Sequence, residues 1–251
     1  MLVNWNESQL AVIQSGPEDR LFVDAGPGTG KTAVACGRIS YLIRNYDLEP
    51  SNVWMVSFTR TAVAEIRARL FSYLNDHSYG IKIATLDSHA WSILSGYDPT
   101  AQLTASYEQN IQRVIEVLEN DIDAVEELFR IEHLIIDEAQ DLVGARADLA
   151  LLVIQKLHRE CGVTIFSDEA QAIYGFSNDY RSDNGNSSNH HPSLARRILA
   201  QQNLGIQKCQ LSAVHRTSVP NLVNIFQNIR ETLVNEENHT RGVYSRIADS
   251  I

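Results

Sequence analysis

A glycine-rich segment between a short apolar run and a helix-forming stretch limits the possible folds of this chain more than any other feature. Residues 25–32 have the sequence AGPGTGKT, follow the apolar run 21–23 and precede residues 33–43, which predict a helix. A strand, a glycine-rich loop ending in Gly-Lys-Thr and a helix form the phosphate-binding arrangement known as a P-loop. A turn that only joins a strand to a helix is the alternative, and the Gly-Lys-Thr ending favours the phosphate site.

The residue types in this loop are those that phosphate binding requires. Glycines let successive backbone N–H groups point toward phosphate oxygens, and the helix adds its unpaired N-terminal amides. Lys31 is expected to reach the β- and γ-phosphates, and the Thr32 hydroxyl to hold Mg²⁺. Ala25 departs from the general pattern, which has a glycine at this position. The residues expected to bind the nucleotide are Gly26, Pro27, Gly28, Thr29, Gly30, Lys31 and Thr32.

A second motif supplies the carboxylates that such a site needs. Residues 134–141, LIIDEAQD, place two adjacent acidic side chains directly after an apolar strand. In this Walker B arrangement, Asp137 is expected to fix Mg²⁺ and Glu138 to orient and deprotonate the attacking water. An acidic loop after an ordinary strand is the alternative, and the upstream P-loop makes it the weaker one.

Strand and helix patterns alternate along the chain. Residues 52–58 and 81–86 predict strands, residues 62–74 predict an amphipathic helix, and the segment from residue 163 repeats the design of a strand followed by a polar loop. This alternation predicts the α/β fold of P-loop NTPases, a mostly parallel sheet with helices on both faces and functional loops at the carboxyl ends of its strands. Residues 95–130 are strongly acidic with helical spacing and predict a small helical insert with a solvated face.

Composition limits the partners and the setting. The chain has 251 residues, 31 acidic against 21 basic, and a formal net charge of −10, which does not indicate a general surface for nucleic acid. The three cysteines are far apart and odd in number, which predicts neither a disulfide framework nor a zinc site. No apolar run approaches the roughly 20 residues that span a bilayer, and the N-terminus lacks signal-peptide features. We therefore expect a globular protein of the cytoplasm without a membrane partner.

In addition to the P-loop, two further motifs resemble those of one family. Residues 137–141, DEAQD, and residues 171–176, QAIYGF, resemble segments of the UvrD/Rep-like superfamily 1 DNA helicases, in the family's order. The resemblance runs from Asn6 to Asn224 and concerns the N-terminal RecA-like motor domain. It implies a RecA-like ATP-binding helicase domain over residues 1–217, with ATP and Mg²⁺ as ligands and single-stranded DNA as partner. Residues 218–251 would then be a helical fragment that begins a second motor domain.

The resemblance also implies roles for single residues. Gln9 is similar to the adenine-recognising glutamine, whose amide offers both a donor and an acceptor; an exposed glutamine on an N-terminal helix is the alternative. Gln171 is similar to the residue that senses the γ-phosphate, and Arg216 to an arginine that contacts it. His215 stands where relatives place a tyrosine on the adenine, and Ala33 where many place an arginine. These two departures imply weaker or less selective adenine binding.

The nucleic-acid contacts implied by the resemblance fall on loops at strand ends. Residues 57–60, SFTR, and 85–88, TLDS, are similar to family segments that lie along the DNA. Phe58 and Phe176 are expected to stack on bases, with Arg60 and Thr85 as further contacts; one such stack is worth about 1–3 kcal/mol. Either ring could instead lie in the core, and for Phe58, at the end of an apolar strand, the two alternatives are equally open.

The family's motor also needs a second RecA-like domain, because its ATP binds in the cleft between two domains. Residues 218–251 are too short to be that domain, so the chain is expected to be a truncated piece or a stand-alone motor half that hydrolyses ATP slowly by itself. The alternative function is a nucleotide-gated module that binds a protein partner, which the acidic charge favours. A P-loop kinase or GTPase fits less well, because the sequence has no Asn-Lys-x-Asp guanine signature.

Overall fold

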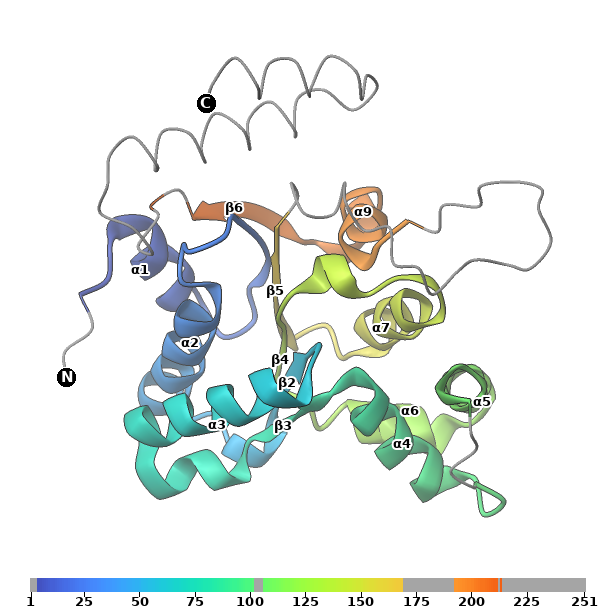
Figure 1. Ribbon diagram of the computed structural model, residues 1–251. Helices are drawn as coiled ribbons and strands as arrows, with labels where there is room; N and C mark the ends of the chain where they lie inside the picture. The colour runs from blue at the N-terminus through green and yellow to red at the C-terminus, as the bar shows by residue number, and fades with distance from the viewer. Residues whose placement is uncertain (1–3, 102–105, 169–191, 212, 214–251) are drawn as a thin grey trace, which may run out of the picture.

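A parallel sheet with helices on both faces forms the frame of the molecule (Figure 1). The computed structural model describes residues 4–101, 106–168, 192–211 and 213. Within them the strands are β1 (Arg20–Ala25), β2 (Val53–Ser57), β3 (Lys82–Thr85), β4 (His133–Ile136), β5 (Gly162–Ser167) and β6 (Gln207–Leu211). The helices are α1 (Glu7–Ile13), α2 (Lys31–Tyr46), α3 (Arg60–Leu74), α4 (Leu86–Tyr97), α5 (Tyr107–Asn120), α6 (Ile122–Leu128), α7 (Gly144–Lys156) and α9 (Leu194–Leu199).

The strand order brings distant segments to one edge of the sheet. The order is β3-β2-β4-β5-β1-β6, and every pairing is parallel. All six strands therefore end at the same edge, which we call the carboxyl edge. Because β5 lies between β1 and β4, the loops that follow β1 and β4 flank the end of β5. The ends of β2 and β3 lie on the far side of β4, away from β1.

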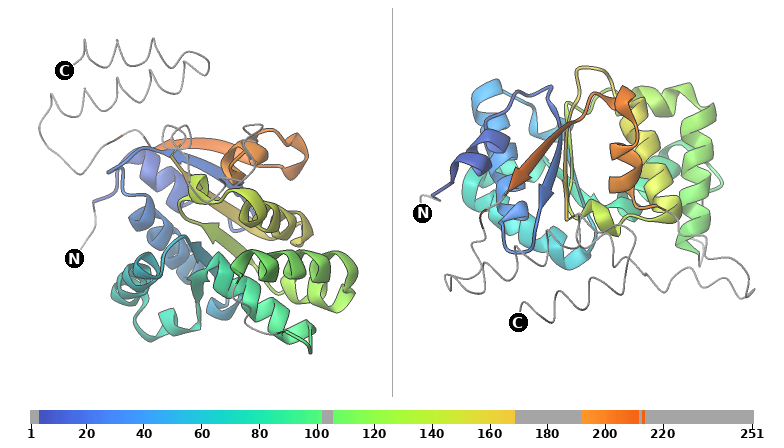
Figure 2. Two further views of the ribbon diagram at one scale, coloured as in Figure 1. Left: turned by 45° about the vertical axis from the view of Figure 1, so that its right-hand side comes forward. Right: turned by 90° about the horizontal axis from the view of Figure 1, so that it is seen from above.

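Side chains alternate between two hydrophobic cores, as expected for strands buried on both faces. In β2, Val53 and Met55 join the core beneath α1, α2 and α3, while Trp54 and Val56 join the core beneath α4, α5 and α7. Seen from above, the two groups of helices lie on opposite sides of the sheet (Figure 2). The fold class is the predicted one, an α/β sheet with helices on both faces.

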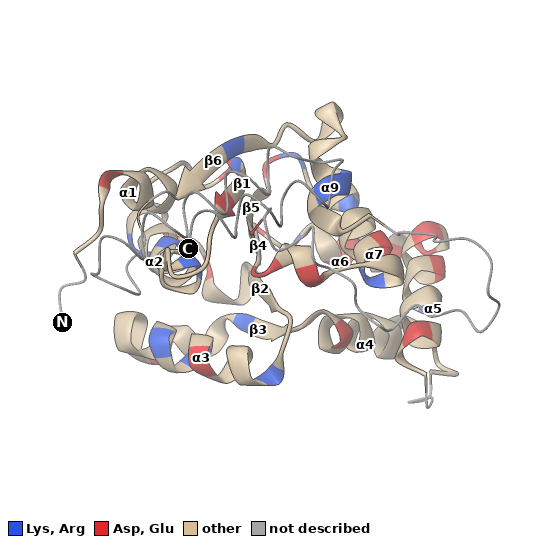
Figure 3. Cartoon of the chain, turned by 45° about the horizontal axis from the view of Figure 1, so that its top comes forward, with Lys and Arg blue, Asp and Glu red and all other residues tan. Residues whose placement is uncertain are grey.

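The helices at residues 107–128 match the prediction of an acidic helical segment. In α5, Ile111, Val114 and Leu118 are buried at helical spacing, while Glu116 and Glu119 are exposed. Figure 3 marks the acidic residues of α5 in red. These helices pack on α4 and α7 as part of one large core, so the segment is continuous with the sheet domain. None of the described helices has the length and apolar character that a membrane span requires.

A buried polar network ties the opposite, amino edge of the sheet together. Arg38 on α2 is 0% exposed, and its Nε donates to Thr164 Oγ1 at 2.8 Å. His133 Nε2 lies 3.0 Å from the same Oγ1, and His133 Nδ1 lies 2.9 Å from Pro17 O. A guanidinium only donates and a carbonyl only accepts, so the Thr164 hydroxyl donates to Nε2, and Nδ1 carries the histidine proton. Burial, with the Arg38 charge, lowers the pKa of His133 to about 3, which keeps the ring neutral.

The predicted elements are confirmed where the structure describes them, with shifted ends. The predicted strands at 52–58 and 81–86 and helices at 33–43 and 62–74 correspond to β2, β3, α2 and α3. The edge strand β6 and helices α7 and α9 were not predicted. Residues 218–251, the predicted start of a second motor domain, lie outside the described residues, so the domain boundaries stay predictions.

Candidate nucleotide-binding site

The P-loop connects β1 to α2 at the carboxyl edge. Gly28 and Gly30 have φ angles of 79° and 85°, a region that favours glycine, and α2 begins at Lys31 directly after Gly30. Thr29 Oγ1 donates to Gly26 O at 2.8 Å, which closes the loop on itself. Lys31 Nζ donates to Ala25 O at 3.2 Å and is largely buried. The loop therefore brings the Lys31 side chain and the N-terminus of the sixteen-residue helix α2 together at the carboxyl edge.

Gln9 supports this loop from the N-terminal helix. Asn6 caps α1, and its backbone N–H donates to Gln9 Oε1 at 3.1 Å, which completes a capping box. The other end of the amide, Gln9 Nε2, donates to Thr29 O at 3.1 Å, and Gln9 is only 3% exposed. The alternative of an exposed glutamine is therefore wrong. Adenine recognition stays a prediction, and support of the P-loop is a role that the sequence did not indicate.

Asp137 faces the P-loop from the end of β4. Thr32 Oγ1 donates to Asp137 Oδ2 at 2.9 Å, and Asp137 is 3% exposed. Burial raises the pKa of Asp137 to about 6, and the neighbouring negative charge of Glu138 adds to the rise. The other oxygen, Oδ1, is buried and has no hydrogen-bond partner among the described residues. This side chain is thus arranged to accept a further positive partner.

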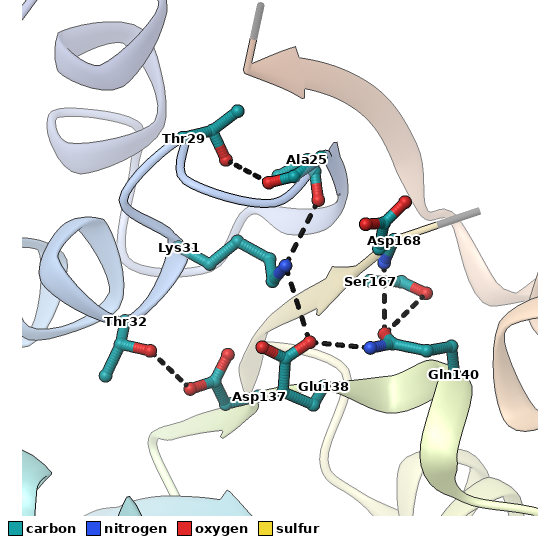
Figure 4. A network of polar contacts seen from close by, with 10 residues as sticks. Ala25, Thr29, Lys31, Thr32, Asp137, Glu138, Gln140, Ser167 and Asp168 are labelled. Carbon is teal, nitrogen blue, oxygen red and sulfur yellow. Dashed lines mark hydrogen bonds and ion pairs between the residues drawn. The ribbon is translucent and has the colours of Figure 1, made fainter. Parts of the chain in front are cut away.

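Glu138 occupies an unusual backbone conformation beside Asp137. Its φ and ψ angles are 55° and 49°, the left-handed region, which costs a side-chain-bearing residue about 1 kcal/mol or more. Glu138 Oε2 lies 3.4 Å from Lys31 Nζ and accepts a 2.6 Å hydrogen bond from Gln140 Nε2. Two partners from different motifs therefore hold the same carboxylate oxygen (Figure 4).

The chemistry of Thr32 and Asp137 fits a magnesium ion that arrives with a nucleotide. Mg²⁺ takes oxygen ligands and is commonly bound through one or two carboxylates together with substrate phosphates. A hydroxyl next to a buried carboxylate with one unpartnered oxygen is such a donor set. The described residues contain no group of three or more His, Cys, Asp or Glu that could hold a metal ion alone, so the remaining ligands would come from phosphates or water.

The predicted nucleic-acid contacts lie farther along the same edge. Phe58 follows β2 and is 47% exposed, so a place in the core, the open alternative, is wrong. Arg60 begins α3 and is exposed, and Thr85 caps α4 at the end of β3. Because β2 and β3 lie beyond β4, these side chains lie on the opposite side of Asp137 from the P-loop. Their contact with nucleic acid stays a prediction.

An ion pair that the sequence did not indicate lies near these residues. Arg146 at the start of α7 pairs with Asp87 at the start of α4, with Nε 3.1 Å from Oδ1. The pair offsets a negative charge that would repel phosphate at this end of the sheet. Four predicted site residues, Gln171, Phe176, His215 and Arg216, lie outside the described residues.

A P-loop at the end of β1, a carboxylate pair at the end of β4 and a parallel sheet between two helical layers define a P-loop nucleotide-binding domain. A family model, the UvrD/REP helicase N-terminal domain, matches residues 5–117 and 100–184. The chain belongs to this family.

Individual relatives agree with the family. The putative ATP-dependent DNA helicase R568 of Acanthamoeba polyphaga mimivirus is 26% identical over 189 residues, 71% of this chain and 27% of the relative. The probable DNA helicase II homolog of Rickettsia conorii is 32% identical over 143 residues, 54% of this chain and 21% of the relative. The chain thus spans about a quarter of the length of these relatives.

The fold also resembles a solved helicase structure. The crystal structure of Pif1 helicase from Candida albicans aligns with a TM-score of 0.51 over 92% of this chain and 44% of that chain. The two sequences are 15% identical. At this identity the likeness concerns the fold, which is the RecA-like α/β fold expected for the family.

Proposed function

We propose that this chain is the ATP-binding motor domain of a UvrD/Rep-like DNA helicase and that it hydrolyses ATP with Mg²⁺. The observation that carries the proposal is the 2.9 Å hydrogen bond from Thr32 Oγ1 to Asp137 Oδ2, which joins the P-loop to the carboxylate pair. A phosphate-binding loop, a cation ligand set and a second carboxylate beside them are the parts that phosphoryl transfer to water requires. Membership in the helicase family supports the same reaction.

The residues divide the work by their chemistry. Lys31, now 3.4 Å from Glu138, would pair with the β- and γ-phosphates of ATP and leave that carboxylate free to act as a base. Glu138 would take a proton from water while the water oxygen bonds to the γ-phosphorus. The bond from the γ-phosphorus to the bridging oxygen then breaks, and ADP leaves with that oxygen. Bound through Thr32 and Asp137, Mg²⁺ would neutralise charge on the phosphate oxygens.

The expected rate of ATP hydrolysis depends on arginines that stabilise the charge of the transferred γ-phosphoryl group. Arg216 is the predicted candidate within this chain, and the family resemblance implies another from a second RecA-like domain. A missing arginine of this kind costs about 10³-fold or more in rate. We therefore expect this domain, assayed without a second RecA-like domain, to hydrolyse ATP slowly.

Single-stranded DNA is the proposed partner along the carboxyl edge. Phe58 offers an exposed ring for stacking, and Arg60 and Thr85 lie at the ends of neighbouring strands. Base stacking tolerates any sequence, which suits a protein that moves along a strand. The net charge of −10 predicts that binding depends on this local track and weakens with salt.

Two substitutions and their matched controls test the hydrolysis. Glu138→Gln removes the general base, which contributes about 10² to 10⁴ in rate, and Lys31→Ala removes the charge that pairs with the β- and γ-phosphates. Each substitution should lower the ATPase rate about 100-fold or more. Lys156→Ala and Glu119→Gln make the same changes on α7 and α5, away from the site, and should leave the rate unchanged. An ATPase rate that Lys31→Ala and Glu138→Gln leave intact would exclude this site as its source.

The acidic surface favours a second candidate, a nucleotide-gated module that binds a protein partner. Glu116, Glu119, Asp123 and Glu126 are exposed on α5 and α6, and this face would repel DNA. Titration of labelled single-stranded DNA, with and without ATP at two salt concentrations, separates the candidates. Saturable binding that weakens with salt supports the motor. The absence of binding at low salt supports the module.

A further inference from the structure

Gln140 joins the carboxylate pair to the end of β5. Its Nε2 donates to Glu138 Oε2 at 2.6 Å. Its Oε1 accepts from the backbone N–H of Asp168 at 3.0 Å and from Ser167 Oγ at 3.3 Å. Gln140 is 3% exposed, and Ser167 and Asp168 are fully buried. Figure 4 shows the amide between the carboxylate and the end of β5. An amide fixed at its oxygen end presents its N–H groups in one direction.

Glu138 needs such a partner because little else in its surroundings fixes it. Its side chain is 34% exposed and its backbone is in the left-handed region. In the described part of the chain, its carboxylate contacts two groups, Lys31 Nζ and Gln140 Nε2, at the same oxygen. Under the proposed function, phosphates draw Lys31 away when ATP binds. Gln140 is then the partner that still holds the carboxylate.

We infer that Gln140 is a positioning residue. It orients the Glu138 carboxylate toward the attacking water and couples this orientation to the position of the end of β5. The inference rests on the proposed function, since a general base matters only if water attacks ATP. The inference goes beyond the proposed function, because the hydrolysis scheme gives Gln140 no role. The chain leads from Asp168 directly into residues 169–176, which hold the predicted γ-phosphate sensor Gln171. Any displacement of the end of β5 would therefore reach Glu138 through one side chain.

Two substitutions distinguish positioning from simple packing. Gln140→Met keeps the length of the side chain and removes both hydrogen-bonding ends. Gln140→Glu keeps an acceptor for Asp168 N–H and Ser167 Oγ but turns a negative oxygen toward Glu138. Gln155→Met is the matched control, because Gln155 is exposed on α7 and pairs only with Gln201 in the described structure. Thermal melting verifies that each variant folds.

Steady-state ATPase kinetics and the binding of a fluorescent ATP analogue are the measurements. Gln140→Met and Gln140→Glu should lower kcat about 10-fold or more, within the range of general base catalysis, while affinity for the analogue changes less than about 2-fold. Gln155→Met should change neither. In a Glu138→Gln background, Gln140→Met should cause no further loss, because the group it positions is already gone.

The outcomes separate this inference from the proposed function. A wild-type kcat in a folded Gln140→Met variant would overturn the inference and leave the hydrolysis proposal standing. So would an equal loss from Gln140→Met with and without Glu138. If wild type and Glu138→Gln have the same ATPase rate, the proposed function fails, and the positioning role fails with it.

Discussion

Arg38 Nε donates a 2.8 Å hydrogen bond to Thr164 Oγ1, although 126 positions separate the two residues in the sequence. The other guanidinium nitrogens donate to Val12 O, Ser15 O and Gly16 O at 2.9–3.0 Å. Burial lowers the pKa of Arg38 to about 10, so the group stays charged at neutral pH. One buried cation thus holds α1, the segment before β1 and β5 together.

Arg38→Met should destabilise the domain strongly. The substitution leaves three backbone carbonyls and the Thr164 hydroxyl without this donor, and each unsatisfied buried group costs about 1–3 kcal/mol. We expect the free energy of unfolding to fall by about 3 kcal/mol or more, measured by urea denaturation. Arg130→Met, which removes an exposed pair with Glu127, should cost less than about 0.5 kcal/mol. Equal effects would show that the buried network contributes little.

Gly162→Ala should also destabilise, for a steric reason. A Cβ at Gly162 would lie 1.9 Å from Pro17 O and 2.3 Å from His133 Nδ1. Neither group can move without breaking the network, so we expect several degrees of loss in Tm. Gly96 in α4 is the control, because its added Cβ would meet nothing within 4 Å. Gly96→Ala should leave the Tm unchanged or raise it slightly, because alanine has the higher helix propensity and Gly96 lies in the last turn of α4. A Tm rise in both variants would contradict the packing described here.

Acid should weaken the fold through its buried histidines. Burial lowers the pKa of His89 from 6.5 to about 4 and that of His133 to about 3. Between pH 6.5 and 4 the unfolded chain therefore binds protons that the folded chain does not, and stability falls as pH falls. Asp137 opposes this trend, because its raised pKa of about 6 makes the folded chain bind a proton first. We expect a net loss of about 3 kcal/mol between pH 7.5 and 4.5.

His89→Phe identifies one source of that loss. The ring stacks on Trp54 with centroids 4.5 Å apart, so phenylalanine can keep the packing and remove the titration. The pH dependence of the unfolding free energy, measured in urea, should shrink by about 2 kcal/mol over the same range. An unchanged slope would show that His89 does not contribute.

Gln9→Leu separates two roles of one side chain. If Gln9 supports the P-loop through Thr29 O, the substitution should weaken ATP and GTP binding by similar factors. If Gln9 recognises adenine, it should weaken ATP binding alone, because guanine presents a different edge. We expect the first result, about a 3- to 10-fold loss for both nucleotides, on the scale of one buried hydrogen bond. Calorimetry with both nucleotides measures the difference.

The sequence predicts the parts of the fold that depend on strong local patterns. The apolar strands before Gly26 and Asp137 are buried on both faces, so they stand out as continuous runs, and the P-loop and carboxylate residues fall where expected. The edge strand β6 was missed because three of its five residues, Gln207, Lys208 and Gln210, are polar and exposed. Short apolar runs bounded by turn residues are easy to recognise only where a strand is buried.

The contacts between motifs could not be predicted. The motif DEAQD contains Gln140, but its two-ended contact depends on the order β4-β5-β1, which brings Ser167 beside it. The capping box formed by Asn6 and Gln9 is local in sequence, yet its second contact, with Thr29 O, crosses to another element. Exposure of Phe58 likewise depends on which loops cover the carboxyl edge.

The Arg38 network and the nucleotide site occupy opposite edges of one sheet, and α2 reaches both. A protein engineer could therefore change the stability of the fold and the activity of the nucleotide site by separate substitutions in this domain. Changes around Pro17, Gly162 and His133 would set how much heat or acid the scaffold survives. The residues of the nucleotide site at the carboxyl edge, such as Lys31 and Glu138, would stay unchanged.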